Sequence, residues 1–277
     1  MKKTTVKAFR EMKGGRKLSM LTAYDASMAR LLDGAGIDAL LVGDSLGMVA
    51  LGYDSTLPVT MEEMLHHAAA VSRGAERALV IGDMPFGSYQ ISPEQAVSNG
   101  IRFIKEGGCA AVKIEGGEEV CGTVRALVRA GVPVIGHIGL TPQTAGQLGG
   151  YKVQGKDLAA ARKLLDDARA LEAAGVFGLV LEAMPAQLAA VITEAVSMPT
   201  VGIGAGPHCD GQVLVIQDLL GLFEKFTPTF VKQYVNLAPE IKAAVQSYIS
   251  EVESGAFPGP EHSFASKENF RALLSGA

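Results

Sequence analysis

The stretch LAAARKLLDDARALEAAGVFGLVLE, residues 158–182, contains one complete helix-to-strand unit. Its first part, Leu158–Ala174, is rich in alanine, leucine and arginine, which are strong helix formers, and Gly175 is the residue type that most often ends a helix. The apolar run Gly178–Leu181 follows directly, and such a run is typical of a strand buried on both faces of a parallel sheet. The stretch therefore predicts alternating helices and strands.

The same alternation extends over the rest of the chain. Eight apolar runs within about 200 residues favour a closed (β/α)8 barrel, or TIM barrel, over an open doubly wound sheet with one dominant nucleotide loop. We expect one α/β barrel domain over residues 1–277, with an N-terminal helix at about 5–13 and a surface tail with a final helix at about 255–277. The predicted strands are Leu18–Thr22, Ala39–Val42, Ala78–Ile81, Ala111–Ile114, Val132–Ile135, Gly178–Leu181, Thr200–Ile203 and Val213–Ile216.

Two helix starts carry a capping signal. Thr60 is followed three residues later by Glu63, and Ser92 by Gln95 with a proline between them, so both segments match the capping-box pattern. We therefore expect Glu63 and Gln95 to be structural.

Composition excludes several classes of function. The formal net charge is −4 and no basic run exceeds two residues, so nothing indicates nucleic-acid binding, and a small soluble molecule is the expected partner. Three cysteines without a C-x-x-C pair indicate neither a disulfide framework nor a zinc site, which favours a reducing, cytoplasmic setting. No apolar segment reaches ~18 residues and no secretory h-region is present, so neither a membrane span nor a signal peptide is expected.

Acidic residues end four of the predicted strands: Asp44, Asp83, Glu115 and Glu182. With 29 acids among 277 residues, eight unselected positions would hold roughly one. In a barrel the chemistry takes place at the C-terminal ends of the strands. Any one of these acids, such as Asp44, would serve equally well as a helix cap, but four at one barrel mouth favour a site.

Clustered carboxylates must either hold protons or share a cation, because their charges repel. Oxygen ligands favour Mg²⁺ or Mn²⁺ over Zn²⁺. His208, Cys209 and Asp210 form an alternative, softer set, but adjacent residues rarely converge on one ion. The sequence therefore predicts a magnesium-type site at the mouth.

Two further residues lie near these acids. Lys113 precedes Glu115 by two positions on one strand, so both point to the same face, where a buried ammonium needs a salt bridge and can also bind an anionic substrate. His137 also ends a strand and is either a hydrogen-bonded core histidine or a functional one. The run Gly202–Gly206 resembles a phosphate loop but lacks the full pattern, and tight packing explains it equally well.

Five stretches together resemble the ketopantoate (3-methyl-2-oxobutanoate) hydroxymethyltransferase family, and the resemblance runs from about Ala8 to Phe264. They are Val42-Gly-Asp-Ser-Leu-Gly-Met-Val49, Thr56-Leu-Pro-Val-Thr60, Val112-Lys-Ile-Glu-Gly-Gly117, Gly136-His-Ile-Gly-Leu-Thr-Pro-Gln143 and Asp210-Gly-Gln212.

The resemblance implies a barrel with an extra N-terminal helix, a homodecamer, Mg²⁺, and 5,10-methylenetetrahydrofolate as the one-carbon donor in pantothenate biosynthesis. It implies that Asp44, Asp83 and Glu115 bind the metal and that Glu182 accepts the proton. The residues expected to contact the substrate are Asp44, Ser45, Asp83, Lys113 and His137.

General chemistry agrees with this expectation. A 2-oxo acid can chelate magnesium, a carboxylate such as Glu182 can remove the C3 proton, and Lys113 can balance the charge of the enolate. One alternative is a magnesium-dependent carbon–carbon lyase or mutase of the phosphoenolpyruvate mutase/isocitrate lyase superfamily, whose Lys-Lys-Cys-Gly-His-type loop is absent here. The other is a non-catalytic barrel, which predicts the loss of at least one carboxylate.

Overall fold

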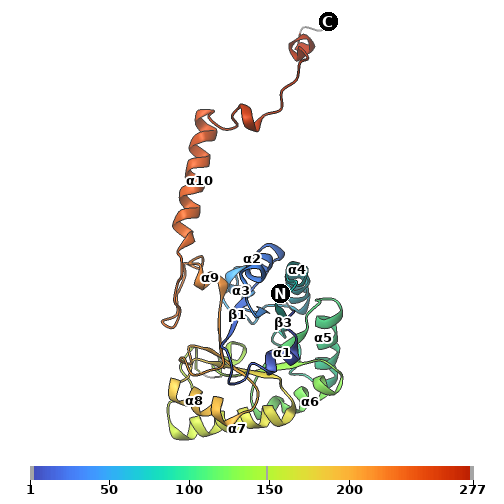
Figure 1. Ribbon diagram of the computed structural model, residues 1–277, viewed down its shortest axis with the longest axis vertical. Coiled ribbons are helices and arrows are strands. Elements are labelled where there is room, and N and C mark those ends of the chain that lie inside the picture. The colour runs from blue at the N-terminus through green and yellow to red at the C-terminus, as the bar shows by residue number, and fades with distance from the viewer. Residues whose placement is uncertain (1–2, 148, 275–277) are drawn as a thin grey trace.

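The computed structural model describes residues 3–147 and 149–274, and its eight parallel strands close into a barrel (Figure 1). Each strand pairs with the next along the chain, and β8 pairs with β1. The predicted TIM barrel is confirmed. The strands are β1 (Leu18–Thr22), β2 (Ala39–Val42), β3 (Leu79–Asp83), β4 (Ala111–Glu115), β5 (Val134–Gly139), β6 (Gly178–Glu182), β7 (Thr200–Ile203) and β8 (Gly211–Leu214).

Helices cover the outside of the barrel (Figure 1). The longer ones between strands are α2 (Ala26–Ala35), α4 (Met61–Gly74), α5 (Pro93–Lys105), α6 (Cys121–Arg129), α7 (Leu158–Ala174) and α8 (Ala186–Ala195). The short ones are α1 (Val6–Arg10), α3 (Leu46–Val49), α9 (Ile216–Leu219) and the 3-10 turns η1 (Glu118–Val120), η2 (Pro142–Thr144), η3 (Pro260–His262) and η4 (Phe270–Leu274). The last α-helix is α10 (Leu237–Ser254). No helix lies between β7 and β8, and the structure describes every residue of the loop that joins them.

Local capping explains where these helices begin and end. Helix α7 has the predicted bounds, because Gly175 takes a left-handed φ of 103° that a residue with a side chain rarely adopts. The capping box of Thr60 and Glu63 is confirmed. The second box is only half present: Ser92 accepts a hydrogen bond from the Gln95 amide, but the Gln95 Oε1 has no partner. The capping box predicted for Gln95 is therefore wrong, because its side chain does not accept a hydrogen bond from the backbone amide of Ser92.

Several predicted boundaries are also wrong, and three of them have a clear physical reason. The N-terminal helix spans only Val6–Arg10, with Thr5 as its cap, and turns follow where the helix was expected to continue to residue 13. Strand β8 begins at Gly211 rather than at Val213; Gly211 packs so closely on β1 that a Cβ atom would lie 2.5 Å from Leu18 Cβ. Strand β5 begins after Pro133, which has no amide hydrogen for the sheet.

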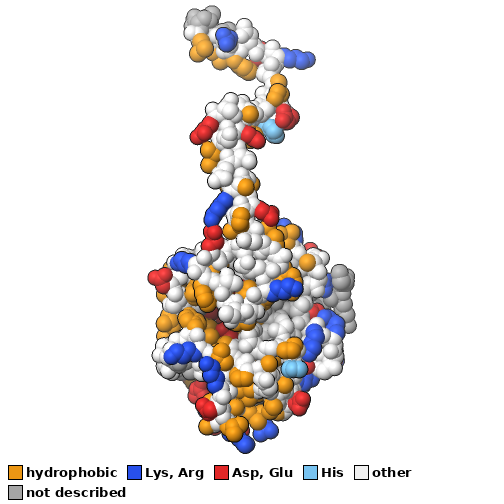
Figure 2. Space-filling model, turned by 90° about the vertical axis from the view of Figure 1, so that its left-hand side faces the viewer, with side chains coloured by type: hydrophobic (Ala, Val, Ile, Leu, Met, Phe, Trp, Pro, Cys, Tyr) orange, Lys and Arg blue, Asp and Glu red, His pale blue; other side chains and the backbone are white. Residues whose placement is uncertain are grey.

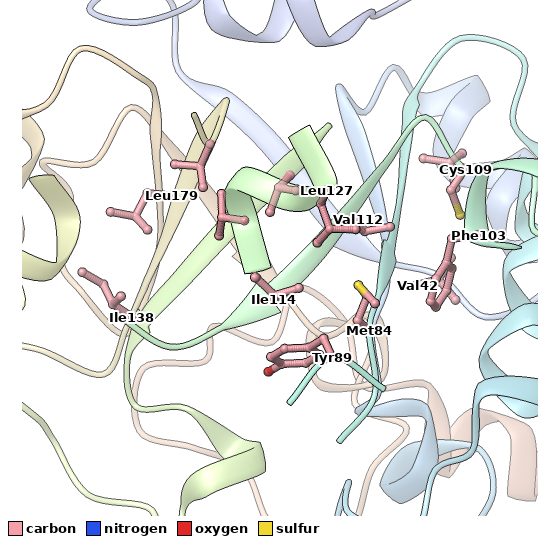
Figure 3. Packing of buried hydrophobic residues seen from close by; sticks show 14 of the residues in the cluster. Val42, Met84, Tyr89, Phe103, Cys109, Val112, Ile114, Leu127, Ile138 and Leu179 are labelled. Atoms are coloured by element: carbon pink, nitrogen blue, oxygen red, sulfur yellow. The ribbon is translucent and has the colours of Figure 1, made fainter. Parts of the chain in front are cut away.

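The hydrophobic core has two layers. The outer layer lies between the strands and the helices and includes Ile114, Leu127 and Leu179 (Figure 3). The inner layer fills the barrel itself, and it is closed at the N-terminal end by Phe9, whose ring meets that of Phe177 edge-on at 5.4 Å. The barrel interior is therefore filled up to the level just below the mouth.

The alternation of a strand places polar side chains directly above this inner core. Successive side chains point to opposite faces, so a residue two positions beyond an inward core residue also points inward. These pairs are Ile81 and Asp83, Ala111 and Lys113, Ile135 and His137, and Val180 and Glu182.

Beyond the barrel, α10 and the tail project away as a slender extension (Figures 1 and 2). Helix α10 was not predicted from the sequence. The final helix expected past Gly255 is seen, within the described part of the tail, only as the 3-10 turns η3 and η4. Within residues 3–147 and 149–274, no helix combines the length and apolarity needed to cross a membrane.

Candidate active site

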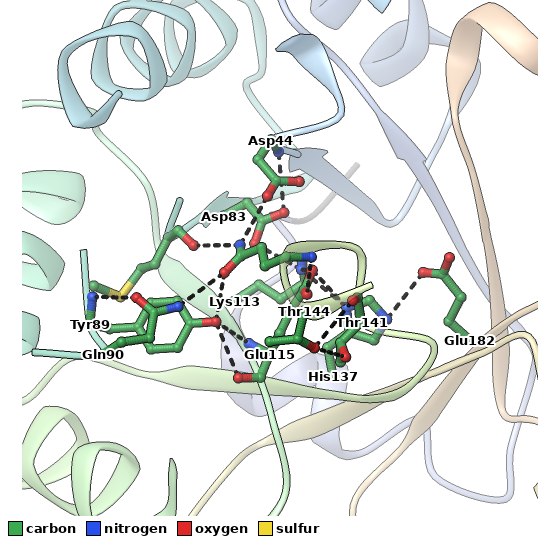
Figure 4. A network of polar contacts seen from close by, with 12 residues as sticks. Asp44, Asp83, Tyr89, Gln90, Lys113, Glu115, His137, Thr141, Thr144 and Glu182 are labelled. Atoms are coloured by element: carbon green, nitrogen blue, oxygen red, sulfur yellow. Dashed lines mark hydrogen bonds and ion pairs between the residues drawn. The ribbon is translucent and has the colours of Figure 1, made fainter. Parts of the chain in front are cut away.

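Six predicted residues meet at the C-terminal mouth of the barrel (Figure 4). They surround a cavity of about 120 Å³. All are buried except Glu182, whose side chain is 16% exposed. These residues are Asp44, Asp83, Lys113, Glu115, His137 and Glu182. Ser45 also lines the cavity, and its hydroxyl lies 2.9 Å from the hydroxyl of Tyr24.

Lys113 lies at the centre of the cluster. Its Nζ is 2.8 Å from Asp83 Oδ1 and 3.2 Å from Glu115 Oε1. Burial alone would lower the pKa of the Lys113 ammonium, but the charges of Asp83 and Glu115 raise it, so the side chain stays protonated. The salt bridge that a buried lysine requires is therefore present.

Glu115 has a lowered pKa, unlike Asp44 and Asp83. Burial would raise its pKa, but the charge of Lys113 and the hydrogen bond with His137 lower the pKa of Glu115 to about 2. Its Oε2 also accepts a hydrogen bond from the backbone amide of Gln143 at 3.0 Å. Glu115 is therefore ionised and fixed in orientation.

Asp44 and Asp83 carry negative charge that Lys113 does not fully balance. The Asp44 amide donates to Asp83 Oδ2 at 3.2 Å, so the two residues are in contact. Burial and the charges of Asp83 and Glu115 raise the pKa of Asp44 well above its ordinary value, and burial also raises the pKa of Asp83. The helix-cap interpretation of Asp44 is wrong, because Ser45 occupies the N-cap of α3 and Asp44 Oδ2 instead accepts from the Gln143 side chain at 2.9 Å.

His137 connects the cluster to Glu182. Its Nδ1 lies 3.4 Å from Glu115 Oε1 and 3.2 Å from the Lys113 Nζ, and its Nε2 lies 3.1 Å from Glu182 Oε2. Burial and Lys113 lower the pKa of His137, but the hydrogen bonds to Glu115 and Glu182 outweigh them and raise it to about 9. His137 thus lies within ion-pair distance of Glu115 and Glu182, but its Nε2 has no hydrogen-bond partner of good geometry, so both interpretations of this residue stay predictions.

Two buried residues that contact the cluster, Gln143 and Tyr89, were not predicted from the sequence. Gln143 is 3% exposed and contacts both Asp44 and Glu115, and Tyr89 hydrogen-bonds to Gln143 and to the backbone of Glu115. Neither ends a strand: Gln143 lies in η2 and Tyr89 in the loop after β3. The only available signal was the presence of Gln143 in one of the stretches that carry the family resemblance.

The donor chemistry of the mouth fits a hard divalent cation. Asp44, Asp83 and Glu115 offer only oxygen atoms, and burial together with the charges of Asp83 and Glu115 raises the pKa of Asp44. Across the described residues, no three His, Cys, Asp or Glu side chains already surround a common point, and Lys113 lies between Asp83 and Glu115. A cation shared by Asp83 and Glu115 would therefore have to displace the Lys113 ammonium from between them.

The alternative sites on β7 and β8 do not form. Asp210 lies at the N-terminal end of the barrel, where it accepts from the Gly14 and Thr200 amides, while His208 is exposed. The glycine run has no helix after it, and a Cβ atom on Gly206 would lie 2.3 Å from Ala186 Cβ. Tight packing therefore explains these glycines.

Fold and site together define a (β/α)8 barrel with carboxylates, a lysine and a histidine at its C-terminal mouth, which is where enzymes of this fold have their active sites. Residues 3–260 match the family model described as ketopantoate hydroxymethyltransferase. The chain is 64% identical over 276 residues to the 3-methyl-2-oxobutanoate hydroxymethyltransferase of Desulfotalea psychrophila, covering 100% of this chain and 99% of that protein. It is 59% identical to the enzyme of that name from Heliobacterium modesticaldum, covering 98% and 99%. The chain belongs to the ketopantoate hydroxymethyltransferase family, as its motifs predicted.

Similar solved structures support the fold alone. A phosphonopyruvate hydrolase has a TM-score of 0.61 at 14% identity, covering 99% of this chain and 95% of the other. A 2,3-dimethylmalate lyase of the phosphoenolpyruvate mutase/isocitrate lyase superfamily has a TM-score of 0.60 at 17% identity, covering 99% and 91%. The barrel is thus shared with the lyase superfamily, whereas the sequence relatives are transferases.

Proposed function

We propose that this chain transfers a hydroxymethyl group from 5,10-methylenetetrahydrofolate to 3-methyl-2-oxobutanoate, forming 2-dehydropantoate in pantothenate biosynthesis. The observation that carries the proposal is the buried cluster of Asp44, Asp83, Lys113 and Glu115 beside Glu182, in a chain of this family. Such a cluster suits chemistry in which negative charge develops on a small anionic substrate.

The cavity has two chemically different sides, which suits a short, branched oxo acid. Strands β2–β5 supply its charged side, and apolar side chains of β6–β8 supply the other. A 2-oxo acid would place its carboxylate and keto group on the charged side and its branched alkyl group on the apolar side. The apolar lining includes Val180, Ile203, Val213 and Leu214.

Asp44, Asp83 and Glu115 are the residues that would hold Mg²⁺, and the oxo acid would bind next to Asp44 and Asp83. When bound, the ion supplies Lewis-acid polarisation of the keto group, which makes the C3 proton more acidic. The carboxylates supply what this requires, because three of them offer oxygen ligands at the mouth while a single ammonium, that of Lys113, lies between Asp83 and Glu115. Ser45, oriented by Tyr24, is placed to donate a hydrogen bond to the substrate.

The protein side chains then divide the reaction between them. Glu182 removes the C3 proton, and its contact with His137 Nε2, 3.1 Å from Oε2, orients the carboxylate for this step. Lys113 balances the negative charge that develops on the substrate. The C3 carbon forms its new bond to the one-carbon unit of the folate, and water supplies the hydroxyl group while tetrahydrofolate leaves.

The two alternatives explain less. A lyase or mutase shares the barrel, but relatives at 57–64% identity are named as transferases. A non-catalytic barrel predicts the loss of a carboxylate, whereas Asp44, Asp83, Glu115 and Glu182 all line the mouth.

Omitting components of the reaction one at a time tests the function. Purified protein with 3-methyl-2-oxobutanoate, Mg²⁺ and methylenetetrahydrofolate is expected to form 2-dehydropantoate, measured by mass spectrometry. Removing the folate is expected to abolish product formation, because the one-carbon donor is then missing. Exhaustive chelation of the metal is expected to abolish it too, because the buried carboxylates then have no cation to share. Adding Mg²⁺ back is expected to restore product formation. Full turnover after chelation contradicts the metal requirement, and no turnover with every component present contradicts the assigned reaction.

We also propose that the enzyme is a homo-oligomer, a decamer by family resemblance, in the cytoplasm. Helix α10 stands clear of the barrel with one apolar face exposed (Figure 2), and an unpartnered stripe of this kind marks a protein contact. A second copy of the chain presents the same stripe. The three cysteine thiols are free and buried, which supports a reducing setting. The exposed face consists of Ile241, Val245, Tyr248, Ile249 and Val252.

A charge placed on this face is expected to disrupt assembly. Val245→Glu should shift the protein to smaller species in sedimentation velocity, because an interface would bury the new carboxylate without a partner. Ser250→Glu puts the same charge on the opposite face of α10 and is the matched control. An unchanged sedimentation coefficient for Val245→Glu, or an equal shift for Ser250→Glu, contradicts the proposed role of this face.

A further inference from the structure

Gln143 bridges two of the proposed metal ligands although it lies on neither of their strands. Its side-chain Nε2 donates to Asp44 Oδ2 at 2.9 Å, and its backbone amide donates to Glu115 Oε2 at 3.0 Å. Asp44 follows β2 and Glu115 ends β4 (Figure 4), while Gln143 lies in η2 after β5. One buried residue thus fixes carboxylates from two different strands.

The surrounding atoms determine which way the Gln143 carboxamide faces. Nε2 also donates to the backbone carbonyl of Met84 at 2.9 Å, and a carbonyl can only accept. The other end, Oε1, accepts from the Tyr89 hydroxyl at 2.8 Å and from Gln90 Nε2 at 3.3 Å. A flipped amide would place two acceptors together at Met84, so Nε2 must face Asp44.

The backbone of η2 sets the second contact. Pro142 occupies the first position of this 3-10 turn, with Thr141 at its N-cap, so the Gln143 amide lies in the first turn, where helical amides have no partner within the helix. Glu115 Oε2 accepts from this amide. Side chain and backbone of one residue therefore hold two carboxylates at a fixed separation.

We infer that Gln143 is a positioning residue that orients Asp44 and Glu115 for the divalent cation. The inference rests on the proposed function, because it assumes that these carboxylates bind the ion. Hydrogen bonds to metal ligands hold those ligands in the binding orientation, and losing one typically weakens metal affinity ~10–100-fold. Tyr89 supports the same geometry through its bond to Gln143 Oε1.

Titrating Mg²⁺ into metal-free protein by calorimetry tests this inference without an activity assay. Gln143→Met keeps the size of the side chain and removes its donors, and we expect Mg²⁺ to bind ~10–100-fold more weakly. Gln95→Met is the matched control, because it removes a partly buried carboxamide whose Oε1 has no partner, and its Mg²⁺ affinity should equal that of the parent. In turnover, Gln143→Met should need correspondingly more Mg²⁺ for half-maximal rate, while kcat at saturating Mg²⁺ changes much less.

The outcomes separate this inference from the proposed function. If the parent binds Mg²⁺ and a folded Gln143→Met protein binds it equally well, the positioning role is overturned and the proposed function stands. If the parent binds no divalent cation, both are overturned. Should Gln143→Met fail to fold by circular dichroism, Gln143→Asn decides: it keeps the carboxamide but withdraws it by one methylene, and an affinity drop of about tenfold supports the role, whereas an unchanged affinity overturns it.

Discussion

Lys113→Met is expected to reduce turnover by ~10²–10³-fold and to lower the free energy of unfolding of the metal-free protein by about 3–5 kcal/mol at neutral pH. The stability loss follows because the variant leaves Asp83 and Glu115 buried without the ammonium that lies 2.8 Å and 3.2 Å from them. The loss of rate follows because nothing then balances the charge that develops on the substrate. Both the salt-bridge role and the substrate role expected for Lys113 are therefore tested in one variant.

The pH dependence of stability provides an independent check. In the parent, the pKa of Glu115 is lowered from 4.5 to about 2, so its ionised form stabilises the fold above pH 4.5, and this contribution is lost as the pH falls from 4.5 towards 2. The charge of Lys113 is the largest single cause of that lowering. The difference in unfolding free energy between parent and Lys113→Met should therefore be largest at neutral pH and shrink through this window.

Lys105→Met, on the exposed surface of α5, is the control for the loss of a positive charge, and neither rate nor stability should change appreciably. Urea unfolding of metal-free protein gives the stability, and steady-state kinetics at saturating Mg²⁺ give the rate. If Lys113→Met lowers stability but retains normal turnover once folded, Lys113 serves only as a salt bridge.

The barrel and most of its mouth were predictable because they depend on short-range patterns. A run such as Ala111–Ile114 followed by Glu115 shows both the buried strand and the acid at its end. The period of two then places Lys113 on the same face as Glu115, which the structure confirms. Acids at strand ends become informative as soon as the barrel brings all strand ends to one mouth.

The residues that were missed depend on tertiary structure. Gln143 and Tyr89 reach the site from loops, and no periodicity relates a loop residue to a strand more than twenty positions away. The start of β8 at Gly211 is hidden for another reason: glycine has low strand propensity and is required there by the close approach of β1. Helix α10 does not pack as the barrel helices do, so the alternation of helices and strands gave no reason to expect it.

The final prediction separates binding from chemistry at Glu182. Glu182→Gln keeps the size of the side chain and removes the base, and we expect turnover and C3 proton exchange in deuterated water both to fall ~10²–10⁴-fold. Affinities for Mg²⁺ and for the oxo acid should change only a few-fold, because the nearest charged partner of Glu182 is His137 Nε2 at 3.1 Å, while Lys113 pairs with Asp83 and Glu115. Glu194→Gln, on the exposed surface of α8, is the matched control and should leave all four quantities unchanged.

Proton exchange is the sharper of the two rate measurements, because enolisation at C3 needs the oxo acid and the metal but no folate, and it can be followed by nuclear magnetic resonance. If exchange continues at the parent rate while turnover collapses, Glu182 acts in a later step, such as breakdown of the folate adduct. If Mg²⁺ affinity collapses instead, Glu182 is a metal ligand and the base must be another residue.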